Sequence, residues 1–190
     1  MSESTASPII AFTAIGTVFV SLFVLMAIEP PMAHAARSFV ERHVQKAMFL
    51  IAGGAMAGSL YYSESVGFIP CEFCWFQRIA MYSLAIVLFV AVVSRGNLDG
   101  RFVVALAAVG LALSIYHYQL QLFPEQGKLC QTGVSCTTKD VNQWGFVTIP
   151  FMAGCGFVSI LILQVARWRG AYLRRHLDEA EDAGTTVWAS

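Results

Sequence analysis

Long apolar stretches alternate with short polar segments along almost the whole chain. A helix needs about 20 mostly apolar residues to cross the hydrocarbon core of a bilayer. Runs of this kind occupy residues 9–28, 47–68, 79–93, 102–122 and 146–165, and the third extends into the residues before it. The pattern therefore predicts five transmembrane helices.

The composition agrees with this pattern. Hydrophobic residues make up 57% of the chain and charged residues only 13%, whereas soluble domains have about 25% charged residues. The formal net charge is zero, which argues against nucleic-acid binding. We expect an all-α, polytopic membrane protein that forms one bundle, contacts membrane lipid and has no nucleic-acid partner.

The lysines and arginines predict the orientation, because loops rich in them stay in the cytoplasm. One set of loops holds only Arg78, Lys128 and Lys139. The opposite set holds nine basic residues: Arg37, Arg42, Lys46, Arg95, Arg101, Arg167, Arg169, Arg174 and Arg175. The C-terminus is therefore expected in the cytoplasm and all the clustered cysteines on the other side.

Three parts of the chain are expected. Residues 1–46 comprise the first apolar helix and, at 31–46, an amphipathic linker on the inner surface. Residues 47–166 hold the other four helices, and residues 167–190 form a partly disordered cytoplasmic tail whose end is acidic.

Two local features of these helices have more than one interpretation. Ala33-His34-Ala35 resembles a signal-peptidase site, but no lysine or arginine precedes the first apolar run and the run is long, which favours a retained helix. Gly54 and Gly58 form a G-x-x-x-G pattern that permits close helix packing, an interpretation favoured over a functional site in this helix.

The first group of cysteines, Cys71 and Cys74, stands where the third helix begins. Two cysteines at this spacing can close a disulfide or share a metal ion. The positive end of the helix dipole favours a thiolate at Cys74. Arg78 follows one turn later on the same face, where it adds a permanent positive charge against the trend for outer loops.

The second group, Cys130 and Cys136, falls in the polar outer loop between the fourth and fifth helices. A disulfide here would close so short a ring that it would stabilise the fold only weakly. An exposed disulfide of this kind is instead an easy target for an incoming thiolate. The two groups thus suggest two cysteine pairs that exchange electrons with each other. The alternative for the loop pair is a purely structural disulfide.

Other residues have weaker signals. His117 lies inside the fourth helix, and an ionisable residue in a span is a functional candidate, here as a donor to a quinone carbonyl or as a structural histidine. Cys155 is read as a small buried hydrophobe. A zinc site built from the four clustered cysteines is disfavoured by the wide spacing of the second group and by an oxidising exterior, so no metal is expected.

These motifs are similar to those of a known family. Residues 71–78, CEFCWFQR, resemble the C-x-x-C-W-x-Q-R signature of BdbC-type disulfide bond formation proteins, relatives of DsbB. The loop pair resembles their second pair, as do residues 144–150, WGFVTIP, and the likeness covers about residues 48–165.

The resemblance implies a DsbB-like four-helix bundle, with residues 9–28 as one extra N-terminal transmembrane helix. It implies a bacterial cell-membrane enzyme that reoxidises a thioredoxin-fold partner, DsbA- or BdbD-like, and passes the electrons to ubiquinone or menaquinone. The resting disulfides would be Cys71–Cys74 and Cys130–Cys136.

By the same resemblance, Cys130 would form the mixed disulfide with the partner and Cys136 would exchange with Cys71. Cys74 would then meet the quinone. Arg78, His117 and Ile149 would contact the quinone, because they stand at the positions that match the family's quinone-contact residues.

Three features depart from the family pattern: the extra first helix, Gln77 where DsbB proper has a glutamate, and the close spacing of the loop pair. Two other functions stay open. One is a quinone reductase like vitamin K epoxide reductase, although in that class the loop pair precedes the CxxC. The other is a non-catalytic membrane module with structural disulfides.

Overall fold

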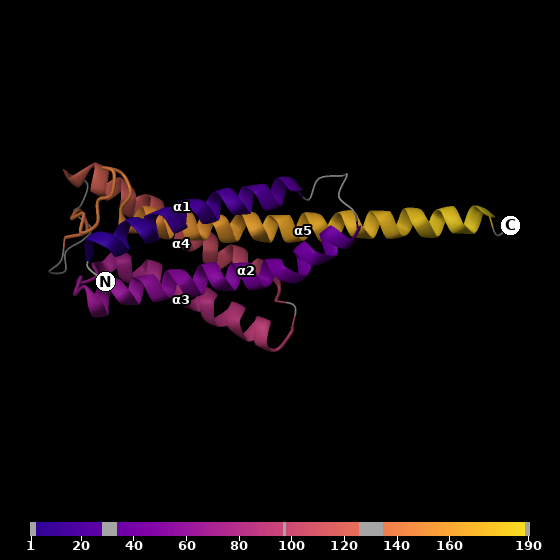
Figure 1. The fold of residues 1–190 in the computed structure, drawn as a ribbon, viewed down its shortest axis with the longest axis horizontal. Coiled ribbons are helices and arrows are strands. Elements are labelled where there is room, and N and C mark those ends of the chain that lie inside the picture. The colour runs from indigo at the N-terminus through magenta and orange to yellow at the C-terminus, as the bar shows by residue number, and fades with distance from the viewer. Residues whose placement is uncertain (1–2, 28–33, 97, 126–134, 189–190) are drawn as a thin grey trace.

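The computed structural model describes residues 3–27, 34–96, 98–125 and 135–188. Within them the chain is all-α, as predicted, and the only β-type pairing is an isolated bridge between Gln143 and Val147. The helices are α1 (Glu3–Ala27), α2 (His34–Leu60), the π-helical turn η1 (Tyr61–Ser65), α3 (Glu72–Val93), α4 (Gly100–Leu122) and α5 (Ile149–Trp188) (Figure 1).

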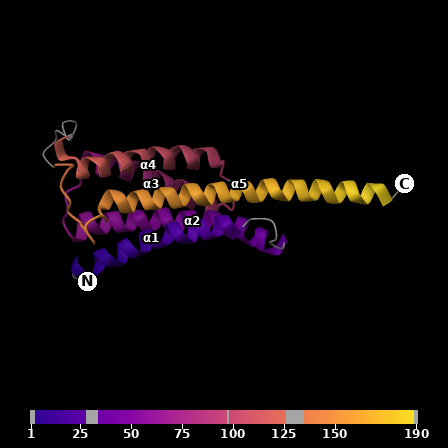
Figure 2. The same cartoon turned by 90° about the horizontal axis from the view of Figure 1, so that it is seen from above.

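The five long helices run alternately up and down, side by side (Figures 1 and 2). The N-terminal ends of α1, α3 and α5 therefore lie at the same end of the bundle as the C-terminal ends of α2 and α4. We call this the cysteine end, because it carries residues 61–74 and 135–149. At the opposite end α5 projects well beyond the other helices.

The bundle is apolar both inside and outside. Its core is built from side chains of α2, α3 and α5 that are at most 1% exposed, among them Met48, Leu84, Leu88, Phe157 and Ile160. On the outer faces large apolar side chains are also exposed, such as Phe23 at 73% and Phe102 at 64%. Such a surface suits lipid and would be costly in water.

Four helical segments are long and apolar enough to cross a membrane: Ser7–Ala27, Glu72–Val93, Gly100–Leu122 and Ile149–Glu179. The protein is thus a multi-pass membrane protein with four candidate spans in the described residues, not the five predicted. The apolar run predicted at 47–68 is missing from them, because α2 ends at Leu60 and its N-terminal half is polar. An extra span added to a four-span core is therefore not shown.

Two helices continue where the sequence predicted a change. The linker at 31–46 and the run after it were expected as separate elements, yet α2 is one helix from His34, since strong helix formers fill its N-terminal half. Similarly, α5 continues to Trp188 through the tail expected to be partly disordered. There His176 pairs with Glu179 at 3.4 Å, one turn apart.

Helix packing uses different glycines from those expected. A Cβ added at Gly54 or Gly58 would meet nothing within 4 Å, so this pair does not make a close helix contact. A close contact lies instead at Gly110 in α4, where an added Cβ would overlap the buried ring of Phe157 in α5. Glycine at 110 lets these two helices approach.

Replacing Gly110 by alanine should therefore destabilise the bundle by about 1–3 kcal/mol, since the new methyl group would overfill a packed contact. Thermal unfolding in detergent measures the effect. Gly53→Ala is the matched control, because its Cβ would sit at an ordinary 3.7 Å from the Phe49 ring. Equal melting temperatures for the two variants would contradict this account of α4–α5 packing.

Candidate active site

Cys71 and Cys74 meet at the start of α3. Cys71 is the N-cap residue, in an extended conformation at φ −73° and ψ 173°, and Cys74 lies in the first turn, as predicted. Both are free thiols here, and their sulfur atoms share a hydrogen bond of 3.1 Å. The two sulfurs lie close enough to form a disulfide after a small movement, and the predicted Cys71–Cys74 bond stays a prediction.

His117 of α4 connects this pair to the outer loop. It is 2% exposed, and its Nε2 atom lies 3.2 Å from the carbonyl oxygen of Cys136 and 3.7 Å from the sulfur of Cys71. Its Nδ1 atom lies 3.2 Å from the side-chain amide nitrogen of Gln77. Because a carbonyl only accepts, Nε2 carries the hydrogen and donates, and Nδ1 accepts from Gln77.

Cys136 brings the outer loop to the same place. It is disulfide-bonded and 1% exposed. Together with Cys71 and Leu120 it forms a small buried cluster against Phe73 and Cys74. Cys130, predicted to be its partner, lies outside the described residues. The structure therefore unites three of the four predicted catalytic cysteines, and the pairing of Cys130 with Cys136 stays a prediction.

The electrostatics favour a thiolate at Cys71, which precedes the membrane-spanning helix. The hydrogen bond from the Cys74 thiol lowers the pKa of Cys71, and His117 lowers it further, although burial opposes both. Asp140 in the outer loop has a raised pKa, first because of burial and then because of the nearby Cys71. A reduced pair in this setting holds one ionised sulfur, the form that attacks disulfides.

A cavity of about 430 Å³ opens beside Cys74. Its walls come from α1, α2, α3, α5 and the segment after η1, and they include the predicted residues Arg78 and Ile149. His117 is not among the lining residues, although the sequence suggested that it donates to a quinone. Both of its ring nitrogens already have partners.

Arg78 is held at the wall of this cavity. Its Nη2 atom donates to the carbonyl oxygen of Ser59 at 3.0 Å, near the end of α2. Its guanidinium also lies 5.3 Å from the ring centroid of Trp75, a distance at which cation–π attraction acts. These contacts keep a permanent charge one helical turn from Cys74.

Sequence reasoning assigned no role to Tyr82, which also lines the cavity. Its hydroxyl is buried and has no hydrogen-bond partner among the described residues. A buried hydroxyl without a partner is costly, so a ligand that accepts from it would be favoured. Spacing offered one signal, because Tyr82 lies four residues after Arg78 and thus on the same face of α3.

The same geometry bears on metals. The ligating atoms of Cys71, Cys74 and His117 all lie within 4.8 Å of one another, a separation that a thiophilic ion accepts. The expected absence of a metal therefore stays a prediction. Cys155 is a free, half-buried thiol in α5, outside this group.

Comparison with known proteins agrees with the site. Residues 41–172, more than half of the chain, match the family described as "Disulfide bond formation protein DsbB". The chain is 42% identical over 118 residues to "Disulfide bond formation protein C" of Bacillus subtilis, covering 61% of this chain and 86% of that protein. It is 43% identical over 117 residues to a "Probable disulfide formation protein" of Oceanobacillus iheyensis, covering 58% and 79%.

No solved structure matches the chain significantly. The family match and the paired thiols beside a buried histidine lead to the same class, a membrane thiol:disulfide oxidoreductase. The chain belongs to the DsbB family of disulfide bond formation proteins.

The reduced Cys71–Cys74 pair should ionise below the ordinary thiol range, which lies near a pKa of about 8.5. Lowering the pH should protonate Cys71 only after an ordinary thiol is already protonated, because its hydrogen bonds favour the thiolate. Thiolate absorbance at 240 nm, assigned by its loss in Cys71→Ser, measures the titration.

In the same titration His117→Phe should raise the midpoint, since it removes one of the groups that lower the pKa of Cys71. His176→Ala is the control, because that histidine pairs with Glu179 in the projecting part of α5. A midpoint that His117→Phe leaves unchanged would refute the assigned role of the imidazole.

Proposed function

We propose that this protein reoxidises an extracytoplasmic thioredoxin-fold partner, DsbA- or BdbD-like, and passes the electrons to ubiquinone or menaquinone in the membrane. This activity would support disulfide formation in exported proteins. The observation that carries the proposal is the cavity beside Cys74. Its wall holds a fixed arginine and a tyrosine hydroxyl that has no hydrogen-bond partner in the described part of the chain.

These groups suit a quinone. The lining of the cavity is largely apolar with a few polar groups, as expected for a site that binds an apolar ring with two carbonyl oxygens. Arg78 and Tyr82 would donate to the carbonyl oxygens, and Ile149 would contact the ring. A bound quinone supplies the electron acceptor, since it takes up two electrons and two protons to become a quinol.

The thiol steps follow from exchange chemistry. A thiolate of the partner attacks the Cys130–Cys136 disulfide, bonds to Cys130 and releases the Cys136 thiolate. The second thiol of the partner then breaks this mixed disulfide, so the partner leaves oxidised and the loop pair is reduced. Two electrons and two protons have now entered the protein.

The next exchange takes place inside the buried cluster. The Cys136 thiolate attacks Cys71 of the Cys71–Cys74 disulfide, and the bond to Cys74 breaks. Cys74 is then the free thiolate, in the wall of the cavity and one turn from the positive charge of Arg78. When Cys130 displaces Cys71 from Cys136, the loop disulfide is restored and the bundle holds the electron pair for the acceptor.

His117 serves the sulfur exchange in this scheme. Its Nε2–H group donates to the carbonyl oxygen of Cys136 and lies near the sulfur of Cys71, so it holds the loop against the bundle. Gln77 fixes the ring from the other side. His117 is thus a positioning residue, and quinone binding falls to Arg78 and Tyr82.

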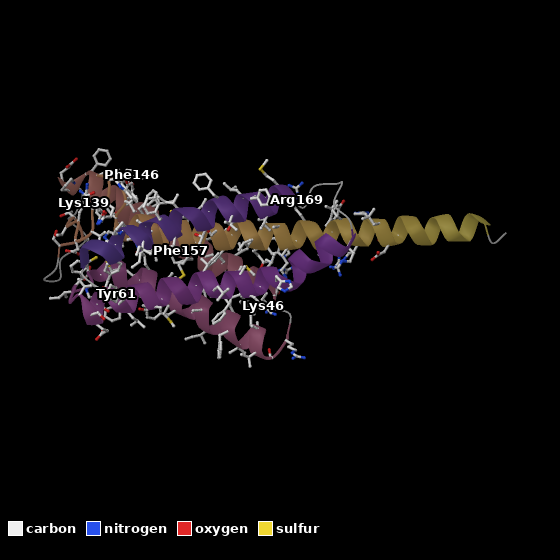
Figure 3. All side chains as sticks on the ribbon, viewed as in Figure 1. Lys46, Tyr61, Lys139, Phe146, Phe157 and Arg169 are labelled. Carbon is white, nitrogen blue, oxygen red and sulfur yellow. The ribbon has the colours of Figure 1, made fainter. Side chains whose placement is uncertain are left out.

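The topology completes the proposal. We place α2 in the membrane as a fifth span, because Val44, Met48 and Ala52 pack into the same core as the candidate spans. Lys139 lies at the cysteine end, whereas Lys46 and Arg169 lie toward the opposite end of the bundle (Figure 3). By the distribution of basic residues, the cysteine end faces outward from the bacterial cell membrane and α5 projects into the cytoplasm.

The two alternative functions lose their support. Membership of the DsbB family disfavours an enzyme of the vitamin K epoxide reductase class. A purely structural role for the cysteines does not explain why a close cysteine pair, a buried histidine and a cavity lie together.

Cys74→Ser should abolish quinone reduction by the reduced partner, because no thiol would then be left in the wall of the cavity. Turnover is followed by quinone absorbance, and thermal unfolding checks that the fold is intact. Cys155→Ser, a change to a thiol outside the site, should leave turnover unchanged. Normal turnover in Cys74→Ser would remove that residue from the mechanism.

Arg78→Ala and Tyr82→Phe should act on quinone affinity. Each removes a proposed hydrogen bond, and for the neutral tyrosine a loss of about 1 kcal/mol corresponds to a roughly fivefold higher KM for quinone. The arginine effect should be larger because its bond is charge-assisted.

For these two variants, exchange between the partner and the loop pair, followed by thiol trapping, should stay normal. Tyr172→Phe, at an exposed position beyond the cavity, is the matched control. The role of Tyr82 fails if its variant binds quinone as tightly as the wild type.

A further inference from the structure

Helix α1 lies outside the region that matches the DsbB family, which begins at residue 41. Yet α1 is part of the bundle and packs along α5 (Figures 1 and 2). The hydroxyl of Ser159 in α5 donates to that of Thr17 at 3.2 Å. At the cysteine end the ring of Phe12 packs edge-on against Trp144 at 4.7 Å between centroids.

The segment around Trp144 is attached to α1 by a further contact. The backbone of Trp144 is left-handed, at φ 51°, in the tight turn closed by Gln143 and Val147. Buried Ala11 packs in one cluster with Val147 and its neighbours. Helix α1 is therefore attached to the bundle and to the segment that follows Cys136.

The same helix forms one wall of the cavity. Thr13, Ala14 and Thr17 of α1 line it, and Gly54 and Gly58 of α2 line it too. An added Cβ at either glycine would meet nothing within 4 Å. Since these glycines do not serve helix packing, what they provide is space in the cavity. We call the part lined by these five residues the α1–α2 groove.

The groove leads away from the polar end of the cavity. Arg78 bonds to the carbonyl oxygen of Ser59, so the charged group lies at the level of Gly58. Gly54 is about 6 Å farther along α2, at 1.5 Å per residue. From there the lining continues with Leu50 and Ile51, both apolar. The site thus has its charged group beside the sulfur, while the two threonine hydroxyls of the groove donate to backbone carbonyl oxygens of their own helix.

We propose that α1 is a quinone-binding helix, and that the first part of the quinone's prenyl chain lies in the α1–α2 groove over Gly54 and Gly58. The inference rests on the proposed function, since it takes a quinone as the electron acceptor. A molecule with a polar head and a long apolar chain matches the change in lining from one end of the cavity to the other. Because lipid tails are as apolar as the prenyl chain, the groove would contribute affinity through close packing against the chain.

Gly54→Leu tests the groove, because its Cβ would enter open space and the rest of the side chain would fill part of the groove. The KM is measured for a prenylated benzoquinone and for a benzoquinone without a side chain. We expect the variant to raise the first KM about tenfold or more and to change the second less than about twofold, as for a pocket that loses room for a substrate group. Gly16→Leu is the matched control: Gly16 also has open space at its Cβ, but it does not line the cavity.

The outcomes separate this inference from the proposed function. If the wild-type protein reduces neither quinone, the proposed function fails and the groove with it. If the wild type reduces both, and Gly54→Leu affects both equally or neither, the groove does not hold the chain while the proposed function stands.

A second measurement addresses α1 itself and does not depend on a variant's folding. A prenylated benzoquinone with a photoactivatable group on the first part of its chain is bound to the wild-type protein and crosslinked. Labelling within residues 3–27 that unlabelled prenylated quinone competes away supports the proposal. Labelling confined to other helices, or labelling that competition leaves unchanged because lipid fills the groove, overturns it.

Discussion

A single buried imidazole connects the parts of the chain on which this site depends. His117 donates from Nε2 to the carbonyl oxygen of Cys136 in the loop, and its other nitrogen accepts from Gln77 in α3. The sulfur of Cys71 lies beside the same ring. Because each ring nitrogen has a partner, the ring can hardly rotate without leaving a buried polar group unpaired, which is costly. The loop and the CxxC pair are thus held together by hydrogen bonds.

This arrangement separates two tasks that the sequence left undivided. On one side of α3, Cys71, Cys136 and His117 form a closed cluster suited to exchange between sulfurs. On the other side, Cys74, Arg78 and Tyr82 face a cavity suited to a small apolar ligand. Both cysteines stand at the start of α3. Electrons that arrive at Cys71 by sulfur exchange therefore need only pass to the neighbouring Cys74 to reach the cavity.

Much of the fold could be read from the sequence, because apolar runs mark membrane helices directly. The start of α3 at the CxxC pair was also predictable. The boundaries of α2 were not, since helix propensity continues across the polar residues before the apolar run. Gly54 and Gly58 were misread because G-x-x-x-G describes a close contact and an open wall equally well; only the positions of neighbouring helices distinguish them.

The site shows the same division. Cys74, Arg78 and Ile149 could be placed together from their motifs, and they do line one cavity. The contact of His117 with Cys136 could not be predicted, because Cys136 lies in a loop whose path the sequence does not define. The hydroxyl of Tyr82 has no hydrogen-bond partner among the residues that the structure describes, and this depends on its surroundings and not on its position in the chain.

The deep burial of Cys136 limits which reductants can reach the site. With Cys136 only 1% exposed and Cys71 only 6%, a thiol dissolved in the surroundings has no direct approach to either sulfur. Small-molecule thiols are thereby kept from reducing these cysteines directly. In the proposed mechanism, electrons therefore enter through a partner protein that attacks the loop disulfide.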